Sequence, residues 1–361
     1  MIAALLLIAT FLPGALSVNV DSARVTPVLE KARLAGTVLI AEGDRIVYER
    51  AFGTIDPAGG QRHRLGQTWR YASVTKQWTA TIAMQEVAAG RLDLDRLIRA
   101  YLPDSKAPFA DRITPRMLMQ HVSGVPRTEE SPIGADDWPS FYLAPPGDRG
   151  TGIAYCEGPT ARSPPATFRY GDCDFIIMGA ILERISGKPY ATLVRERIAQ
   201  PLGLKSVGLF PRGTATIVGY EKQNRESRLF RLENFGAAGA LFGTTHDLLK
   251  FDRALMTGKL IPDAQRATLW QGDPKLGYAA LGQWAFSAPI KGCGTMPVRF
   301  IERRGAIGGV VLRNVIMPDL DMVLIMTSNR AEADAAFGEI WQQRGITHDV
   351  LAATLCPVTA K

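Results

Sequence analysis

The chain has 361 residues, of which 46% are hydrophobic and 21% are charged, a composition that is ordinary for a folded globular protein. This length can bury a complete hydrophobic core, either as one large domain or as two lobes. The formal net charge is +7, but Lys and Arg are dispersed and form no long basic run, so nucleic acid is not an expected partner. An anionic substrate or an anionic cell envelope fits this charge better.

The N-terminal segment departs from this composition. Residues 2–12 form an apolar run interrupted only by Thr10, followed by Pro13-Gly14 and then by Ala15-Leu16-Ser17, with small residues at the first and last of these positions. The run is too short to cross a bilayer comfortably, so it predicts a signal peptide at residues 1–17 and a periplasmic or secreted protein. No Lys or Arg precedes the run, and an uncleaved anchor or a buried first helix is the alternative. No later run approaches membrane-spanning length, so no membrane span is expected after signal removal.

The cysteines agree with export. Cys156, Cys173, Cys293 and Cys356 fit an oxidising compartment, and none of them belongs to a C-x-x-C pair. The four histidines are scattered, so we expect no metal and no other cofactor. Cys156 and Cys173 bracket a Pro-rich segment, and pairing them leaves Cys293 to pair with Cys356. Closing the first loop contributes about 3 kcal/mol in the chain-entropy description.

Two strands, residues 36–42 and 45–52, are the first predicted elements, and the turn between them makes an early β-hairpin. Helices are expected at residues 73–89 and 114–121, the second with Thr at its N-cap and Pro in its first turn. Residues 126–166 are rich in Pro, Gly, Asp and Ser and predict a long irregular loop.

The second half of the chain also contains both predicted helices and predicted strands. Helices are expected at 175–185 and 190–198, strands at 298–303, 309–316 and 322–327, and a closing helix at 331–343. Strands at both ends with helices between them predict an α+β fold, in which an antiparallel sheet flanked by helices forms an α/β sandwich beside a mainly helical lobe. We expect residues 18–75 and 205–361 in the sheet lobe and residues 76–204 in the helical lobe.

The motif that suggests chemistry is Ser73-Val74-Thr75-Lys76, at the start of a predicted helix. Three residues is just under one turn, so the lysine amine can reach the serine hydroxyl. A serine becomes a nucleophile when a neighbouring base takes its proton, and the helix N-terminus directs N–H groups to where an oxyanion would form. The motif alone is weak, and an ordinary surface Ser and Lys is the alternative.

Longer blocks support the motif. They are residues 71–95 (YASVTKQWTATIAMQEVAAGRLDLD), 113–126 (ITPRMLMQHVSGVP), 168–187 (FRYGDCDFIIMGAILERISG), 201–204 (PLGL) and 236–251 (GAAGALFGTTHDLLKF). In this order they resemble the serine β-lactamase and penicillin-binding-protein superfamily, in the branch of class C β-lactamases, D-Ala-D-Ala peptidases and related esterases. The resemblance implies a β-lactamase/transpeptidase-like fold and an acyl-enzyme mechanism.

The resemblance also assigns roles. Ser73 would be the nucleophile and Lys76 its proton acceptor, and Tyr170 would help to move the proton to the leaving group, with a buried structural tyrosine as the alternative. The backbone N–H groups of Ser73 and Ala306 would form the oxyanion hole. Gly305 would let the substrate lie against the strand.

Two positions depart from the family pattern. Asp172 stands where the family has Asn, so it can hold Lys76 as an ion pair but cannot donate to a substrate carbonyl. Arg303 stands where the family has Lys or His, and a guanidinium suits bidentate carboxylate binding better than proton transfer. We therefore expect a carboxylate-bearing substrate, unless Arg303 points out of the pocket.

Taken together, these features predict a serine hydrolase that cleaves an ester or amide of a small molecule or peptide, cell-wall peptide being one option. The two replacements favour an esterase or D-amino-acid peptidase over an efficient β-lactamase. A catalytically silent binding or sensor domain that retains the pocket is the alternative. His121 is expected to be a core histidine and Asp247 a helix N-terminal charge.

Overall fold

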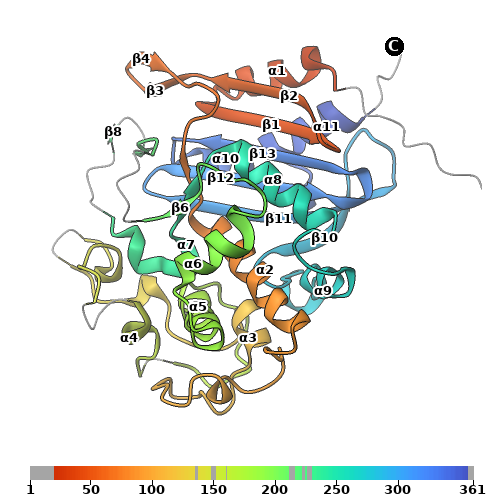
Figure 1. Ribbon diagram of the computed structural model, residues 1–361. Helices are drawn as coiled ribbons and strands as arrows, with labels where there is room; N and C mark the ends of the chain where they lie inside the picture. The colour runs from red at the N-terminus through yellow and green to blue at the C-terminus, as the bar shows by residue number, and fades with distance from the viewer. Residues whose placement is uncertain are drawn as a thin grey trace, which may run out of the picture.

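A six-stranded antiparallel sheet with helices on both faces stands above a mainly helical region (Figure 1). This computed structural model describes residues 20–134, 137–147, 152–159, 161–210, 216–221, 224–225 and 230–356. The predicted signal peptide at residues 1–17 lies outside the described residues. The α+β arrangement expected from the sequence is confirmed.

The two ends of the chain build one sheet. Its strand order is β10-β11-β12-β13-β1-β2, and every neighbouring pair is antiparallel. The N-terminal hairpin joins the C-terminal strands through β1 and β13, where Val38 lies opposite Met326. The strands are β1 (Gly36–Glu42), β2 (Arg45–Phe52), β10 (Trp284–Pro289), β11 (Pro297–Ile307), β12 (Val310–Met317) and β13 (Met322–Ser328). The sequence analysis anticipated five of these strands and did not identify β10.

Short strands complete the β structure. They are β3 (Thr54–Asp56), β4 (Gly59–Arg62), β5 (Trp69–Arg70), β6 (Gly208–Leu209), β7 (Tyr220–Glu221), β8 (Asn224–Arg225) and β9 (Leu241–Gly243). The order β5-β9-β6 forms a small sheet of its own. This small sheet matters for the site because β5 leads directly into the segment that carries Ser73.

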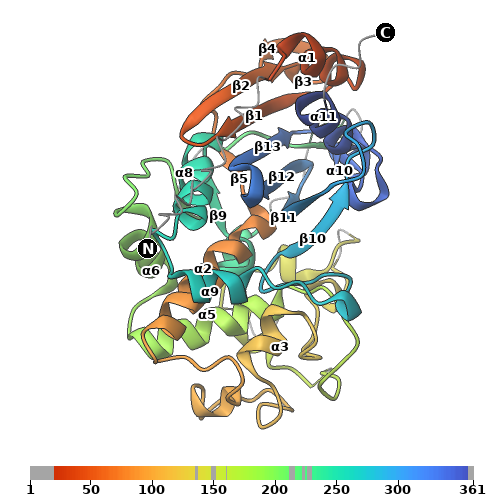
Figure 2. The same cartoon turned by 90° about the vertical axis from the view of Figure 1, so that its right-hand side faces the viewer.

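Different helices cover the two faces of the large sheet (Figure 2). On one face lie α1 (Ser22–Lys31), α10 (Ala333–Phe337) and α11 (Ile346–Leu355), which bury an apolar core with the sheet. On the other face lie α2 (Thr75–Ala88) and α8 (Thr245–Met256), where Trp78 stacks on Phe251 with ring centroids 4.3 Å apart. The second core continues from there into the helical region.

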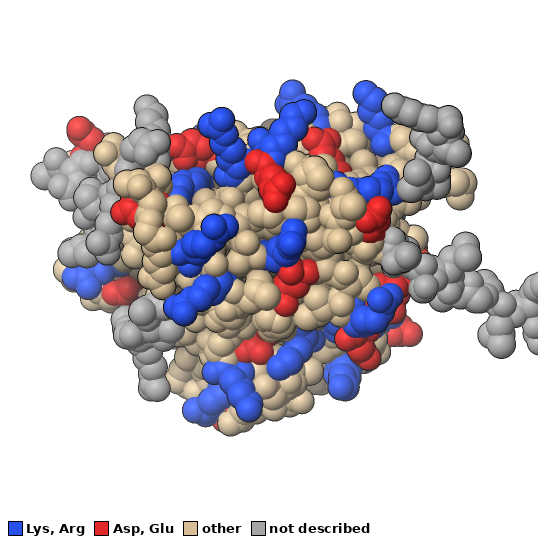
Figure 3. Space-filling view, turned by 90° about the horizontal axis from the view of Figure 1, so that it is seen from above, with Lys and Arg blue, Asp and Glu red and all other residues tan. Residues whose placement is uncertain are grey.

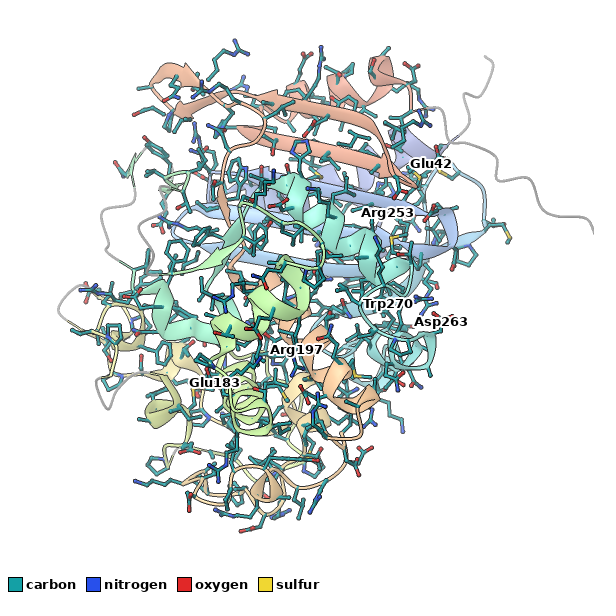
Figure 4. All side chains as sticks on the ribbon, in the orientation of Figure 1. Glu42, Glu183, Arg197, Arg253, Asp263 and Trp270 are labelled. Carbon is teal, nitrogen blue, oxygen red and sulfur yellow. A yellow bond between two sulfur atoms is a disulfide. The ribbon has the colours of Figure 1, made fainter. Side chains whose placement is uncertain are left out.

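The helical region surrounds α2. Its other helices are α3 (Pro115–Met119), α4 (Gly152–Cys156), α5 (Cys173–Ser186), α6 (Tyr190–Val194), which continues as a π-turn at Arg195–Ala199, α7 (Gly236–Gly239) and α9 (Asp263–Leu269). Thr114 caps α3 by accepting from the Met117 N–H (3.2 Å), as its sequence predicts. Buried Glu86 of α2 forms an ion pair with Arg197, which is labelled in Figure 4. Because neighbours cover α2 on almost every side, the start of this helix is fixed in place.

The predicted closing helix at 331–343 is wrong. The chain forms only α10 there, then reverses at Gly338 (φ 68°) and passes through a 3-10 turn at Ile340–Gln342. A Cβ on Gly338 would lie 2.5 Å from the Arg344 carbonyl oxygen, so the two backbone segments approach too closely for one continuous helix. The helix that closes the described chain is α11.

Two disulfides are present, in the pairing that the sequence favoured. Cys156–Cys173 joins α4 to the first residue of α5, and Cys293–Cys356 joins the segment before β11 to the end of α11. The first bond ends one residue after Asp172. Over the ranges listed above, the helices are too short or too polar to span a membrane. Figure 3 shows one face of the molecule, on which acidic and basic side chains are intermixed.

A buried polar network connects α2, α8 and β12. The Asn314 Nδ2 donates to Gln77 Oε1 (3.1 Å) and to Asp252 Oδ1 (2.9 Å), and Gln77 Nε2 donates to Gln283 Oε1 (2.8 Å). The Asp252 side chain is fully buried, and its Oδ2 has no hydrogen-bond partner among the described residues. Burial raises the pKa of Asp252 well above its usual value.

Asp252→Asn should therefore stabilise the protein more at pH 8 than at pH 4. The folded protein keeps the Asp252 proton to a higher pH than the unfolded chain, so wild-type stability falls as pH rises through the folded-state pKa. Asn cannot titrate, and we expect a gain on the order of 1–3 kcal/mol at pH 8. Urea unfolding at both pH values measures it, with exposed Asp263→Asn as the control. A gain that is equal at the two pH values would contradict the prediction.

Candidate active site

A strained turn presents Ser73 at the start of α2. Ala72 has a φ of 45°, in the left-handed region that residues with a side chain rarely adopt. The turn is held because the Tyr71 N–H donates to the Leu241 carbonyl (2.9 Å) and the Tyr71 hydroxyl donates to the Thr244 carbonyl (2.7 Å). Such strain persists only where the surroundings enforce it, and it is common at functional sites. Ser73 itself stays partly accessible.

Lys76 lies one turn further into the helix and is completely buried. Its Nζ donates to Ser73 Oγ (3.1 Å), to Asp172 Oδ1 (2.5 Å) and to the Ala238 carbonyl (2.9 Å), which uses all three donors of an ammonium group. The second oxygen of Asp172 accepts from Thr128 Oγ1 (3.3 Å). The expected Lys76–Asp172 ion pair is therefore present.

Tyr170 also reaches Ser73. The two hydroxyl oxygens are 2.5 Å apart, and Lys76 Nζ lies 4.9 Å from the centre of the Tyr170 ring. Because Tyr170 precedes α5 by only three residues, the disulfide at Cys173 fixes the same segment. The sequence-predicted Ser73, Lys76, Tyr170 and Asp172 thus meet at one place.

Arg303 lies behind Tyr170 and differs from its expected position. Its Nη2 donates to the Tyr170 hydroxyl (2.5 Å), and its Nε donates to the Ser73 carbonyl (2.9 Å). The guanidinium carbon is 4.9 Å from the Tyr170 ring centre and 5.1 Å from that of Trp284, and the residue is only 2% exposed. Among the described residues that line the pocket at Ser73, Arg303 does not appear. The guanidinium is hydrogen-bonded within the protein, to Tyr170 and to the Ser73 carbonyl.

A second buried pair, His121 and Asp174, lies next to the Tyr170 ring. The ring of His121 lies 4.7 Å from that of Tyr170, and its Nδ1 is 3.0 Å from Asp174 Oδ2. Burial, with Arg303 and Lys76 nearby, lowers the pKa of His121 well below its usual value, so the imidazole is neutral at neutral pH. Burial also raises the pKa of Asp174. The prediction of a core histidine is confirmed, whereas its partner Asp174 carried no sequence signal that set it apart.

A narrow pocket opens at Ser73, with a volume of about 40 Å³. Ser73, Asp172 and Ala306 supply its polar side, and the prediction that the Ser73 and Ala306 N–H groups form an oxyanion hole concerns this side. Aromatic and aliphatic side chains form the other wall: Tyr142, Leu232, Phe235 and Ile307. Sequence reasoning missed this wall because Tyr142, Leu232 and Phe235 lie in short 3-10 turns and Ile307 is the last residue of β11, positions that no motif marks.

Gly305 has a role that the sequence analysis did not foresee. A Cβ at this position would lie 2.1 Å from the Tyr71 carbonyl oxygen and 3.3 Å from the Ser73 nitrogen. The missing side chain therefore lets β11 touch the turn that carries Ser73, and the residue is buried. The structure thus gives Gly305 a contact within the protein, and its contact with substrate stays a prediction.

The remaining candidates are structural. Arg304 points to the opposite face of the sheet and pairs with Glu302 and Glu339. Asp247 lies in the first turn of α8 and accepts from the Lys205 and Ser206 N–H groups at 2.9 and 2.8 Å. Within the described part of the chain, no three His, Cys, Asp or Glu side chains are grouped so that they could hold a metal ion.

The family of this chain follows from its similarity to known proteins. Residues 22–347 match the family model described as Beta-lactamase. The chain belongs to the beta-lactamase family. The esterase EstB of Burkholderia gladioli is 29% identical over 226 residues, which cover 54% of each chain. The putative penicillin-binding protein PbpX of Bacillus subtilis is 24% identical over 245 residues, or 66% of this chain and 59% of the relative. The chain thus spans little more than half the length of these relatives.

Solved structures of this family share the fold. The penicillin-binding protein of Bacillus halodurans has a TM-score of 0.70 at 22% identity, over 91% of this chain and 98% of that one. The D-amino acid amidase of Ochrobactrum anthropi, complexed with L-phenylalanine amide, has a TM-score of 0.74 at 20% identity, over 92% and 98%. The β-lactamase/transpeptidase-like fold is therefore confirmed.

Gly305→Ala tests whether the close contact between β11 and the Ser73 turn sets the geometry of the site. The added methyl group cannot share space with the Tyr71 carbonyl, so either β11 or the Ser73 turn must move. We expect a loss of at least ~10²-fold in kcat/KM on an activated ester, because ångström-scale displacement of reacting groups has that effect. Gly134→Ala is the control, since Gly134 does not have a positive φ and the nearest atom to a Cβ there, the Trp138 carbonyl oxygen, lies at 3.6 Å, an ordinary contact distance. An active Gly305→Ala protein would show that this contact does not set the geometry.

Proposed function

We propose that this protein is a serine hydrolase that forms an acyl-enzyme at Ser73 from an ester or an amide. The observation that carries the proposal is the convergence of Lys76 Nζ and Tyr170 Oη on Ser73 Oγ, at 3.1 and 2.5 Å. A hydroxyl with proton-transfer groups in hydrogen-bond reach is the arrangement that nucleophilic catalysis needs. Relatives named as an esterase and as a D-amino acid amidase support the reaction class.

In the proposed reaction, Ser73 Oγ bonds to the carbonyl carbon and gives up its proton. The carbonyl oxygen becomes an oxyanion that accepts from the Ser73 and Ala306 N–H groups. Collapse of the intermediate breaks the bond to the leaving group, which takes the proton, and an acyl-enzyme remains. Water then attacks the acyl carbon, which releases the acid and returns a proton to Ser73.

The contacts favour Tyr170, acting as a phenolate, over Lys76 as the group that accepts the first proton. Lys76 forms an ion pair with Asp172, and all three of its donors are engaged. The Tyr170 oxygen accepts from Arg303, and negative charge on it would be stabilised by both cations. In this scheme Lys76 orients Ser73, and Arg303 positions Tyr170.

The same contacts lead to a proposal for the substrate class. Asp172 is occupied by Lys76 and Thr128 and can only accept, so it offers no donor to an amide carbonyl of a β-lactam side chain. Simple esters and D-amino-acid peptides, including cell-wall peptides, fit this site better. The two disulfides also support the proposal that the protein acts outside the cytoplasm, as a secreted or periplasmic enzyme.

The central test is Ser73→Ala. Removing the nucleophile should lower turnover of p-nitrophenyl acetate by at least ~10³-fold and abolish the mass increase that a fluorophosphonate causes in the wild type. The measurements are initial rates and intact mass, with the exposed Ser22→Ala as the matched control. Turnover that survives in Ser73→Ala would overturn the proposal. Wild type that binds substrate analogues without labelling or turnover would instead indicate a silent binding domain.

Arg303→Ala tests what the buried guanidinium does. If it positions Tyr170, an acid-bearing ester and its methylated, uncharged analogue should lose kcat/KM equally, by about 10- to 100-fold, the worth of a charged hydrogen bond. Arg299→Ala on the same strand is the control, and both esters should keep their rates there. A loss confined to the acid-bearing ester would restore the expectation that Arg303 binds a substrate carboxylate.

A further inference from the structure

The narrow pocket at Ser73 lies on one side of the nucleophile. Ser73 and Ala306 line it. Tyr170 is not among the described residues that line it, although its hydroxyl oxygen is 2.5 Å from Ser73 Oγ. In the proposed reaction the leaving group takes the proton that Tyr170 has accepted, so this group departs toward the Tyr170 hydroxyl. The acyl chain, which stays bonded to Ser73, is then directed into the pocket.

The pocket is small. Its volume is about 40 Å³. One water molecule occupies about 30 Å³ of the liquid, so this space matches one or two groups of that size, such as the methyl of an acetyl group or the ethyl of a propionyl group. Pockets that hold drug-sized ligands have volumes of about 300–1,000 Å³. A longer acyl chain must therefore displace the wall of the pocket or turn away from it.

Contacts between two short turns fix the wall. The rings of Tyr142 and Phe235 have centroids 4.9 Å apart, and the Arg231 N–H donates to the Tyr142 carbonyl (2.8 Å). The Asn234 side chain, in the same turn as Phe235, donates through Nδ2 to the Phe141 carbonyl (2.8 Å). Displacing the wall would break these buried contacts, so the wall sets a limit on the length of the acyl chain.

The same wall is apolar. The side chains of Leu232, Phe235 and Ile307 contain no hydrogen-bonding group. The hydroxyl of Tyr142 lies 3.5 Å from Thr128 Oγ1, a partner within the protein. A charged acyl chain would lose its water against this wall without gaining a hydrogen-bond partner.

We infer that this pocket binds the acyl group of the substrate and selects a short, uncharged chain, so that acetyl and propionyl esters are the substrates of the site. This inference rests on the proposed hydrolase activity and narrows its substrate class. It separates simple esters of small acids from peptides, whose acyl groups are longer and polar.

The first test moves one alkyl chain from one side of the carbonyl to the other. The isomers p-nitrophenyl hexanoate and 4-butyl-2-nitrophenyl acetate both release a nitrophenol, but only the first has a long acyl group. Relative to p-nitrophenyl acetate, kcat/KM should fall at least ~10-fold for the hexanoate, because a methylene that does not fit a pocket has that effect. The butyl-substituted acetate should stay close to p-nitrophenyl acetate. All rates are corrected for those of Ser73→Ala.

The second test enlarges the pocket. Leu232→Ala should raise the hexanoate-to-acetate ratio of kcat/KM by about 10-fold, because the longer chain then has room. Leu34→Ala is the matched control, since Leu34 is 6% exposed and Leu232 is 5% exposed, but Leu34 belongs to the core on the other face of the large sheet. Ile307→Ala, at the partly exposed end of β11, should shift the ratio in the same direction and replaces Leu232→Ala if that variant does not fold.

The outcomes distinguish the pocket from the reaction. Equal rates for the three esters, an equal loss when the chain is on the leaving group, or an unchanged ratio in the folded pocket variants would overturn the acyl pocket and leave the hydrolase intact. A wild type that hydrolyses none of the three esters would overturn the proposed function, and the acyl selectivity with it.

Discussion

The buried ammonium group of Lys76 is the constraint on which the site depends. A cation with no solvent exposure is strongly destabilising unless it is paired and its donors are satisfied. Its three partners come from three parts of the chain: Ser73 one turn earlier, Asp172 at the start of α5, and the Ala238 carbonyl in α7. The hydrogen bonds of this one ammonium group therefore require α5, α7 and the turn that carries Ser73 to lie next to one another. The same requirement explains why a carboxylate is tolerated at position 172, where the family pattern has an amide.

Arg303 adds a second buried cation on the other side of Tyr170. Lys76 forms an ion pair with Asp172, and Arg303 donates to the Tyr170 hydroxyl. The two cations and one carboxylate leave a net positive charge next to the Ser73 and Tyr170 hydroxyl oxygens, which are 2.5 Å apart. The neighbouring His121 avoids adding to that charge by remaining neutral. Relative to a site with Asn and a neutral His at these two positions, the change to Asp and Arg leaves the net charge the same.

The sequence was informative where a local pattern decides the structure. Alternating and apolar runs located the hairpin, the three late strands and most helices, and the ordered family blocks located Ser73, Lys76, Tyr170 and Asp172. It failed where tertiary contacts decide. The break at Gly338 depends on a close approach of Arg344, and the inward turn of Arg303 depends on the aromatic rings of Tyr170 and Trp284. β10 was missed because its pairing with β11 supplies what its own short sequence does not signal.

The junction between β1 and β13 has a consequence for how the protein is made. These strands are paired although almost three hundred residues separate them, so the centre of the sheet cannot close until nearly the whole chain is available. Contacts of such sequence separation make folding slow, because the entropy of closing the loop is lost before the pairing compensates for it. A chain emerging from the ribosome therefore keeps its N-terminal hairpin without a partner for most of synthesis. That delay exposes the edge of β1 to mispairing in any compartment where the C-terminal strands arrive late.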